Sequence, residues 1–598
     1  MVEVVADGAP AKALTEHQNA LARDVGSNRQ LTEKNASRHF KRTVKRHSFA
    51  VKIPMSKYVH EEDGSVVSLP WIRPSSLLLY LLTSYQWLLL GGCEVVEQAE
   101  AMLQSFWDNY KVNHPSHTVF NRSPVPLKRT IPVALHGDGA RTQKMQPLEI
   151  FSLEAVLGVD SYQCKECRHD PCGCPQTKKR RKQFGDPLVQ CLNQKHHSYL
   201  TRFLLFAFAS KELKMPGLLR ALLQQVGDDL GKVCEEGIQT PHGRWGIAVV
   251  GYKGDMEYHA KTSISRSYAN VGHVNFIRCC HECEAGHRNH PFEDPNPAAS
   301  WVSTRYTTLP WVTMPPFTSI PFEDWSGDTN AKAALFFRRD SFHIFRLGIG
   351  RNFVASCIIL MCHNALFDDG ESDYSMERRM KTAWSHFYLW CSSTGQRPQS
   401  IRSFTRDKLH FKRGSFPYVS CKGSDTVLLL KWLIFIIELT RKSVENASLK
   451  QTLGVMLLGA RSGLVFTQYI HRHGLWMRKH CVGKLRLAVK RFLHCYSVLA
   501  KESLDNSISL FGMVPKYHSM AHYIADIDDF QARNQGDDVL LLNPACFDCS
   551  MNEDFVGAVA KQSRRIGYRC LLDNLFLAYK VKLRFVIKRY MEKKGKRS

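Results

Sequence analysis

The stretch that decides the fold is Arg129-Thr-Ile-Pro-Val-Ala-Leu-His-Gly-Asp138-Gly, together with Gly246-Ile-Ala-Val-Val-Gly-Tyr-Lys-Gly-Asp255. Each is a short apolar run that ends in an acid near glycine, which predicts a buried strand followed by a turn. The chain between them predicts two more strands, at 148–157 and 199–209. A helix with apolar side chains every three to four residues is predicted at 216–236. The predicted order is therefore strand with Asp138, strand, strand, helix, strand with Asp255.

A third acid stands far downstream, in Ser550-Met-Asn-Glu553-Asp554. This run predicts a helix that Ser550 or Asn552 caps and that carries acids in its first turn. Residues 345–510 are mostly helical by pattern. The fold class expected from the sequence is thus an α/β core plus a long α-helical part.

Two acids at the ends of neighbouring strands and one on a later helix can hold two divalent cations. Phosphodiester chemistry uses two Mg²⁺ or Mn²⁺ ions, and these ions prefer carboxylate ligands on a rigid support. We expect Asp138 and Asp255 to supply that support and Glu553 to close the site, with Asp554 as its neighbouring competitor. The alternative interpretation is that an acid before glycine is an ordinary turn residue.

The order of these elements resembles the RNase H-like core of DDE transposases, and the local motifs resemble the CACTA (En/Spm-like) superfamily. The resemblance covers residues 125–570. Five short motifs carry it: Leu135-His-Gly-Asp138-Gly, Gly251-Tyr-Lys-Gly-Asp255, Cys279-Cys-His-Glu-Cys283, Asp340-Ser-Phe-His343 and Val514-Pro-Lys-Tyr-His518-Ser-Met-Ala-His522.

The resemblance implies an RNase H-like mixed sheet interrupted by a large helical insertion, with small Cys/His-rich loops. It also implies an enzyme that uses two Mg²⁺ or Mn²⁺ ions for DNA strand cleavage and transfer at transposon ends, with Asp138, Asp255 and Glu553 as its catalytic acids. Asp255 is followed by Met-Glu257 where the family has Phe-Pro, so Glu257 is an alternative second acid. Asp340, with His343 three residues later, is the reserve.

Two other functions remain open from the sequence. One is a domesticated descendant that binds DNA but has lost catalysis, which the altered context of Asp255 motivates. The other is a zinc-binding interaction protein. The sequence has no GxxxxGK[ST] phosphate loop, so it gives no indication of ATP use.

Two Cys/His clusters have spacings that suit tetrahedral zinc. The first is Cys280-x2-Cys283-x3-His287-x2-His290, and the second is Cys164-x2-Cys167-x4-Cys172-x-Cys174. The alternative for each is a loop of reduced cysteines. Three other histidines, His343, His518 and His522, are interpreted as hydrogen-bonded core residues.

The net charge of +26 over 598 residues is concentrated in four segments: 29–52, 178–182, 471–494 and 561–598. Basic clusters on a body that is otherwise close to neutral predict a polyanionic partner, here DNA. Seven side chains are the candidate DNA contacts: Lys178, Lys179, Arg180, Arg181, Lys182, Arg564 and Arg565.

The sequence shows no secretory signal, and its longest apolar stretches, Leu77–Leu90 and Val427–Leu439, are shorter than the ~18 residues of a membrane span. We therefore expect a nuclear protein with no membrane partner, and a homo-oligomer remains open. The expected domains are a disordered basic arm (1–55), a helical region (56–125), the core (126–345) with Cys/His-rich inserts at 160–185 and 278–292, the helical insertion (346–512), and the acidic helix with a basic tail (513–598).

Overall fold

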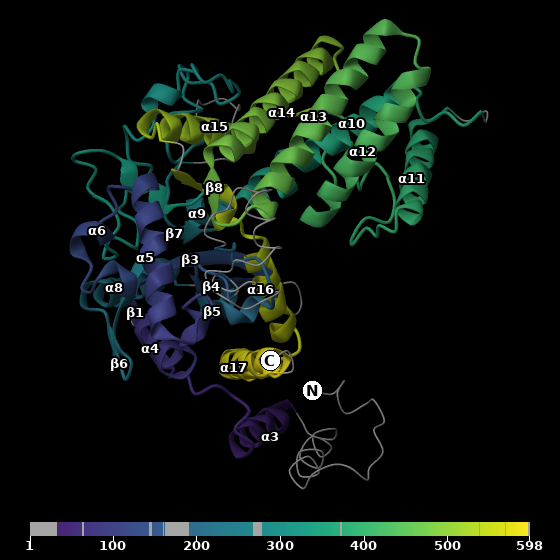
Figure 1. Cartoon of the computed structure of the whole chain (residues 1–598). Helices are drawn as coiled ribbons and strands as arrows, with labels where there is room; N and C mark the ends of the chain where they lie inside the picture. Colours follow the sequence, from purple (N-terminus) through teal and green to yellow (C-terminus); the bar gives the residue numbers. More distant parts are fainter. Residues whose placement is uncertain are drawn as a thin grey trace.

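The protein, described here as a computed structural model, has a mixed α/β fold: a curled five-stranded sheet with helices around it, and a group of long helices that extends to one side (Figure 1). The structure describes residues 33–595 with these exceptions: 63–64, 143–145, 160, 162–189, 214, 267–277, 371–373, 537–538 and 568–569.

The central sheet has the strand order β5-β4-β3-β7-β6. Its strands in chain order are β3 (Thr130–Arg141), β4 (Pro147–Ala155), β5 (Arg202–Ala209), β6 (Ile238–Thr240) and β7 (Gly243–Lys253). β3 pairs antiparallel with β4, β4 pairs antiparallel with β5, and β3 pairs parallel with β7. The four strands expected from the sequence are confirmed, and the short β6 adds a hairpin to the start of β7.

The strands are apolar along their length because helices cover the sheet. All eight residues of β5 and the first eight of β3 are buried, as expected for strands with both faces covered. The sheet lies between α8 (Leu218–Glu236) and α16 (Ser550–Ser563) (Figure 1). The predicted helix at 216–236 is confirmed, and its apolar face, from Leu218 to Val233, is buried.

The N-terminal part differs from the expectation in two places. Residues within the expected disordered arm form helix α3 (Glu33–Arg46), which contacts α17 (Leu571–Gly595) through a hydrogen bond from Asn574 Nδ2 to Ser37 Oγ. Residues within the expected helical region form the hairpin β1 (Ser56–Glu62) and β2 (Ser65–Trp71). The expected helices follow the hairpin as α4 (Pro74–Ser84), which starts at a proline as helices tolerate, and α5 (Val96–Asn113).

Residues 346–512 are largely helical, as predicted. The helices are α10 (Gly350–His363), α11 (Met376–Ser393), α12 (Gly423–Ser443), α13 (Ala447–Arg472) and α14 (Lys479–Asp505). Among the described residues, Phe342–His363 and Ala447–Arg472 are long and apolar enough to cross a membrane by length and composition alone. Their apolar windows are 72% and 56% buried in the protein, which is typical of core helices.

The chain then returns to the sheet through α15 (Pro515–Arg533), β9 (Leu540–Leu542) and α16. β9 pairs with β8 (Trp476–Arg478), which lies between α13 and α14. α16 begins at Ser550 with Cys549 as its N-cap, and no side chain caps it. The expectation that Ser550 or Asn552 caps this helix is therefore wrong.

Candidate functional site

Asp138, Asp255 and Glu553 come together at one edge of the sheet. Asp138 lies near the end of β3, and Asp255 follows β7, its parallel neighbour, in which Lys253 pairs with His136. Glu553 lies in the first turn of α16, which packs on β3. The side chains of Asp138 and Glu553 lie close enough to share a hydrogen bond when one of them is protonated, and the charge of Asp255 acts on both. The structure thus unites the three predicted acids.

Burial and the neighbouring carboxylates destabilise the charged form of Asp138. Burial, followed by the charges of Glu553 and Asp255, raises the pKa of Asp138 to about 9. Burial also raises the pKa of Glu553. Without a cation, the pair therefore shares a proton at neutral pH. A divalent cation favours the deprotonated forms, and carboxylate oxygens are the ligands that Mg²⁺ prefers, so this donor set fits such an ion.

Glycines on either side of Asp138 shape the site. A Cβ atom on Gly137 would lie 2.2 Å from the Tyr258 ring and 2.8 Å from the Tyr252 hydroxyl, so the strand can pack there only as glycine. A Cβ atom on Gly139 would meet nothing within 4 Å. The Asp138 backbone is therefore packed tightly on one side and open on the other.

Asp255 also has a structural task. Its Oδ1 accepts a hydrogen bond of 2.7 Å from Tyr258 N and so caps α9 (Met256–Thr262). Glu257, the alternative second acid, is exposed in the first turn of α9. The charges of Asp255, Glu257 and Asp340 all act on Lys516, a basic side chain of α15 that the sequence reasoning did not select.

Asp340, the reserve acid, is surrounded by donors of the protein itself. Its Oδ1 accepts hydrogen bonds from Phe342 N at 2.8 Å and Cys549 N at 2.9 Å. Its Oδ2 bonds His343 Nδ1 at 2.5 Å, and His343 Nε2 lies 3.5 Å from Glu553 Oε1. Asp340 therefore joins the start of α16 to the π-helix η9 (Phe342–Ile349) and orients His343 toward Glu553.

His343 is hydrogen-bonded, as predicted, but it is also part of the acidic site. Burial acts to lower the pKa of His343, yet Asp340 and Glu553 outweigh burial and raise it. The imidazole is thus poised to carry a positive charge between two carboxylates. π-Helical turns such as the one that holds it are frequent at functional sites.

A buried ionic network fixes α16 on the sheet. Glu154 Oε1 of β4 forms an ion pair with Lys253 Nζ of β7 at 2.7 Å. Its other oxygen, Oε2, lies 3.4 Å from Arg202 Nε of β5. Asn552 Nδ2 donates to Glu154 Oε2 at 2.6 Å, and Lys253 Nζ donates to Asn552 Oδ1 at 3.2 Å. Because Asn552 precedes Glu553, this network sets the position of the third acid relative to β3.

Four other side chains form a buried Cys2His2 group that could hold a metal such as zinc: Cys280, Cys283, His518 and His522. Their ligand atoms all lie within 4.8 Å of one another. His522 Nε2 lies 3.3 Å from Cys280 Sγ and 3.5 Å from Cys283 Sγ, and His518 Nε2 lies 3.3 Å from Cys283 Sγ. Standard tetrahedral zinc bonds place N and S atoms about 3.5 Å apart, so the spacing suits zinc.

Two of the four expected ligands, Cys280 and Cys283, belong to this group, whereas the two expected histidines do not. His287 and His290 are only half-buried and lie outside the group, with their rings 6.0 Å apart. His518 and His522 are buried and hydrogen-bonded as expected, and their ring nitrogens face the cysteines. The signal was present in the sequence, because His518-x3-His522 after Pro515 places both rings on one face of a helix.

The second cluster, Cys164, Cys167, Cys172 and Cys174, lies outside the described residues, as does the basic run Lys178–Lys182. Arg564 and Arg565 are exposed at the end of α16. Arg564 Nε donates to the carbonyl oxygen of Arg141 at 3.0 Å, which places this basic pair beside the end of β3, three residues beyond Asp138.

Comparison with known proteins leaves the family open. No protein-family model matches the sequence. No curated protein matches it either. The geometry of the two sites is therefore the basis for inferring a function.

Proposed function

We propose that this chain is a DDE transposase-type enzyme with an RNase H-like core, which cleaves and joins DNA strands at transposon ends with two Mg²⁺ or Mn²⁺ ions. The observation that carries the proposal is the proximity of the Asp138 and Glu553 carboxyl groups, with the charge of Asp255 acting on both. These acids come from two strand ends and a helix some 300 or more residues later. An acidic cluster assembled at such a distance favours a ligand-binding role over three unrelated turn residues.

The sheet topology supports the RNase H-like part of the proposal. Three consecutive strands pair antiparallel, α8 follows, and β7 then pairs parallel with the first of them. Phe337, three residues before Asp340, forms a parallel bridge with Tyr252 on the outer side of β7. In this interpretation, residues 346–512 are the helical insertion that separates the second acid from the third.

The proposed chemistry requires two divalent cations bound by the three acids. One ion would activate the attacking oxygen of a water or a DNA hydroxyl, and the other would stabilise the leaving oxygen as its bond to phosphorus breaks. Asp138, Asp255 and Glu553 would hold the ions. Lys516, whose charge is felt by the acids, and Arg564 would offer cations to the neighbouring phosphates.

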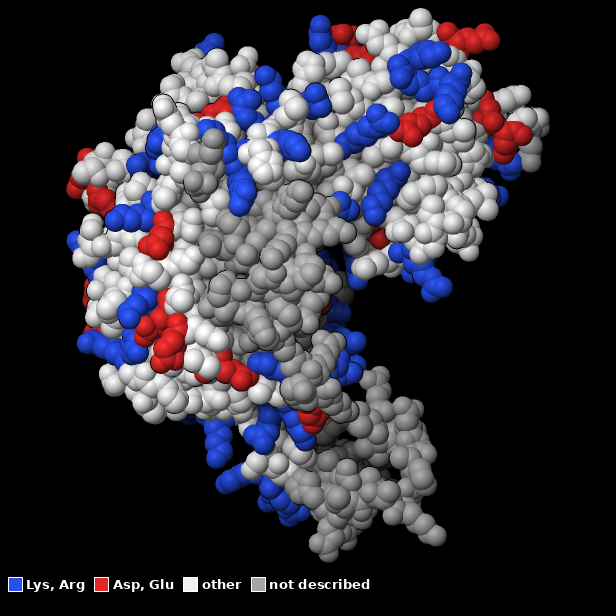
Figure 2. Space-filling view, viewed as in Figure 1, with Lys and Arg blue, Asp and Glu red and all other residues white. Residues whose placement is uncertain are grey.

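Two basic helices at the surface support DNA as the partner. α3 and α17 lie side by side at the lower end of the molecule, where Lys and Arg side chains gather on the surface (Figures 1 and 2). α17 alone contains seven Lys and Arg residues against two acids in its sequence. Phosphate contacts of this kind bind DNA with an affinity that falls steeply as salt rises. A DNA-processing role places the protein in the nucleus.

The test is DNA nicking and strand joining by the full chain with Mg²⁺ or Mn²⁺. We expect Asp138→Asn and Glu553→Gln to reduce either reaction by at least about a thousandfold, the scale of a lost charge-stabilising group. The matched control is Asp554→Asn, because Asp554 Oδ2 accepts a hydrogen bond from Ser198 Oγ at 2.7 Å instead of joining the cluster. Full activity of Asp138→Asn would refute the proposal.

A second candidate is the domesticated DNA-binding descendant, and the observation that favours it is the capping of α9 by Asp255. A capping task alone would retain this acid after catalysis is lost. Salt-sensitive DNA binding with no metal-dependent cleavage would establish this alternative. If cleavage occurs, comparison of Asp255→Asn with Glu257→Gln identifies the second acid, and we expect only the former to abolish it.

A further inference from the structure

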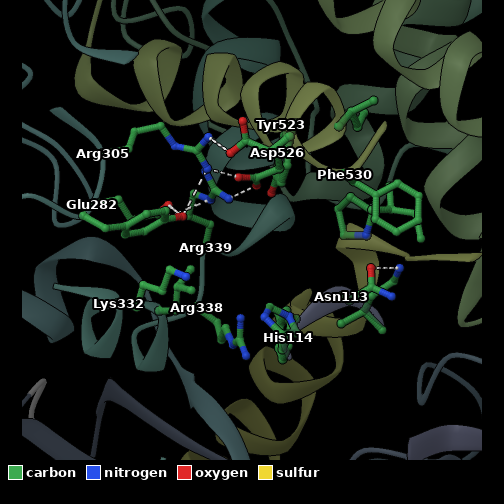
Figure 3. Close-up of a pocket in the computed structure, with 18 of the residues that line it drawn as sticks. Asn113, His114, Glu282, Arg305, Lys332, Arg338, Arg339, Tyr523, Asp526 and Phe530 are labelled. Carbon is green, nitrogen blue, oxygen red and sulfur yellow. Dashed lines mark hydrogen bonds and ion pairs between the residues drawn. The ribbon is translucent and has the colours of Figure 1, made fainter. Parts of the chain in front are cut away.

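A pocket of about 420 Å³ lies between the C-terminal end of α5, helix α15, strand β9 and the segment that precedes Asp340 (Figure 3). It is distinct from the acidic site, since none of Asp138, Asp255 and Glu553 lines it. Its volume is in the range of small-molecule binding sites. The pocket therefore has room for a ligand of mononucleotide size.

One side of the pocket is an ionic network whose charges are already paired. Arg305 binds Asp526 and Asp529, each at 2.5 Å. Arg339 also pairs with Asp526, and its Nε lies 3.2 Å from Glu282 Oε1. This side, in the upper left of Figure 3, is close to neutral and rigid.

The other side is cationic and contains no acid. Lys332, Arg338 and His114 lie along it (Figure 3), and Arg533 also lines the pocket. Burial, followed by the charges of Arg338, His117 and Arg533, lowers the pKa of His114 well below its usual value. His114 is thus a neutral hydrogen-bonding group among cations.

Arg338 is the cation that most needs a counterion. Its side chain is buried, with the residue 6% exposed. Nε and Nη2 donate to the Val250 carbonyl oxygen, and Nη2 also donates to the Tyr110 hydroxyl at 2.9 Å. Within the described part of the chain, no carboxylate forms an ion pair with this guanidinium and Nη1 makes no hydrogen bond, although the charge of Arg338 acts on Glu323, which does not line the pocket. Buried charges are normally paired, so the pocket offers a place for an anion.

Aromatic side chains complete the lining: Phe337, Tyr523, Phe530 and Phe547. The Arg338 guanidinium carbon lies 4.5 Å from the centre of the Phe547 ring, and that of Arg339 lies 5.4 Å from the Tyr523 ring. Aromatic faces are platforms on which bases stack, and Lys and Arg are the usual partners of phosphate. The combination distinguishes this pocket from a site for inorganic phosphate alone.

We propose that this pocket binds a nucleoside phosphate, with the phosphate against Lys332 and Arg338 and the base against the aromatic side chains. The ligand is either a free nucleotide or one nucleotide of a DNA strand. The phosphate would be held by side chains and not by a glycine-rich loop. The proposal does not rest on the acidic site, so the two can fail separately.

The experiment measures saturable binding of AMP to the full chain by calorimetry, with inorganic phosphate as a second probe. We expect one AMP per chain, and about tenfold or greater loss of affinity in Lys332→Ala combined with Arg533→Ala, since the first change removes a charge-assisted contact and the second removes another positive charge that lines the pocket. Neither side chain is buried. Phe530→Leu should weaken AMP but leave phosphate binding unchanged. The matched control is Lys501→Ala, an exposed cation of α14 outside the pocket lining.

Competition identifies the source of the ligand. Displacement of AMP by a 5′-phosphorylated oligonucleotide, but not by its 5′-hydroxyl form, assigns the site to a DNA end. Lack of displacement by either assigns it to free nucleotide. No saturable AMP binding at millimolar concentration, or binding that the double variant leaves intact, would overturn the proposal. Metal-dependent cleavage by the same variants reports on the acidic site independently.

Discussion

The acidic site and the Cys2His2 group are assembled in the same way but differ in what holds them together. Each joins a segment near residues 138–283 to a helix beyond residue 515, with more than 230 residues between the two halves. The acids repel one another, so their proximity opposes folding unless the surrounding residues enforce it. The cysteines and histidines become attractive partners once a metal binds. The difference indicates that neighbouring contacts hold α16 in place, whereas α15, which ion pairs of Asp526 and Asp529 also anchor, would be held more tightly once a metal binds.

The largest effect is expected at the Cys2His2 group. Structural zinc contributes a large share of folding free energy at such sites, so Cys283→Ser or removal of metal with a chelator should lower the Tm by about 10 °C or more. Metal analysis should find one zinc per chain in the parent protein and none in Cys283→Ser. The matched control is His287→Ala with His290→Ala, which should keep both zinc and Tm. Loss of zinc from this control would restore the ligand set first expected from the sequence.

The next largest effect concerns the contacts that hold α16. Glu154→Gln leaves Lys253 and Arg202 buried without their carboxylate, which should cost about 3–5 kcal/mol in the free energy of unfolding. Urea denaturation measures this loss. Glu377→Gln is the control, because Glu377 pairs with Arg406 at the exposed surface, where such a pair contributes at most about 1 kcal/mol. Equal losses in the two variants would contradict a special role for Glu154.

A third effect should appear in the pH dependence of the metal-free protein. Asp138 has a pKa of about 9 when folded, against about 3.9 in an unfolded chain. The folded state therefore binds an extra proton between these values, and stability falls as pH rises through this window. Asp138→Asn should flatten the decline in thermal unfolding temperature between pH 5 and 9. Mg²⁺ should stabilise the parent protein at pH 8 and leave the variant unchanged.

The smallest effect is expected for His343→Gln. Because Asp340 and Glu553 raise the pKa of His343 in the folded protein, its contribution is complete below about pH 6.5 and is lost as pH rises through the folded value. The variant should therefore lose more stability at pH 6 than at pH 8, by amounts within about 1 kcal/mol. An identical loss at both pH values would show that the imidazole does not titrate with folding.

The sequence predicted the acidic site better than the Cys2His2 group. The reason is that the features indicating each acid lie within a short stretch of sequence. Asp138 and Asp255 each follow an apolar run and adjoin a glycine, so a short window contains the signal, although β3 continues past the predicted turn to Arg141. The two halves of the Cys2His2 group are also local patterns. Neither short stretch of sequence indicates that Cys283 lies beside His518 in the fold. His287 and His290 were closer in sequence and were therefore preferred.

Other misses depended on contacts between distant parts of the chain. Residues 33–46 are mostly polar, and their helix is supported by α17, more than 500 residues away. The role of Asp340 was equally hidden, because one of its donors is the backbone of Cys549. Strands such as β3 and β5 were predictable since burial on both faces leaves a continuous apolar run.

The contacts around Asp340 give the long helical segment an unusual topology. Ser341 Oγ donates to Asp548 Oδ2 at 2.9 Å, and Cys549 N donates to Asp340. The residues before and after the long helical segment are therefore hydrogen-bonded to each other. The segment between Ser341 and Asp548 starts and ends at the same place in the fold. Helices far from that junction can be lengthened, shortened or exchanged during evolution without moving Glu553 away from Asp138.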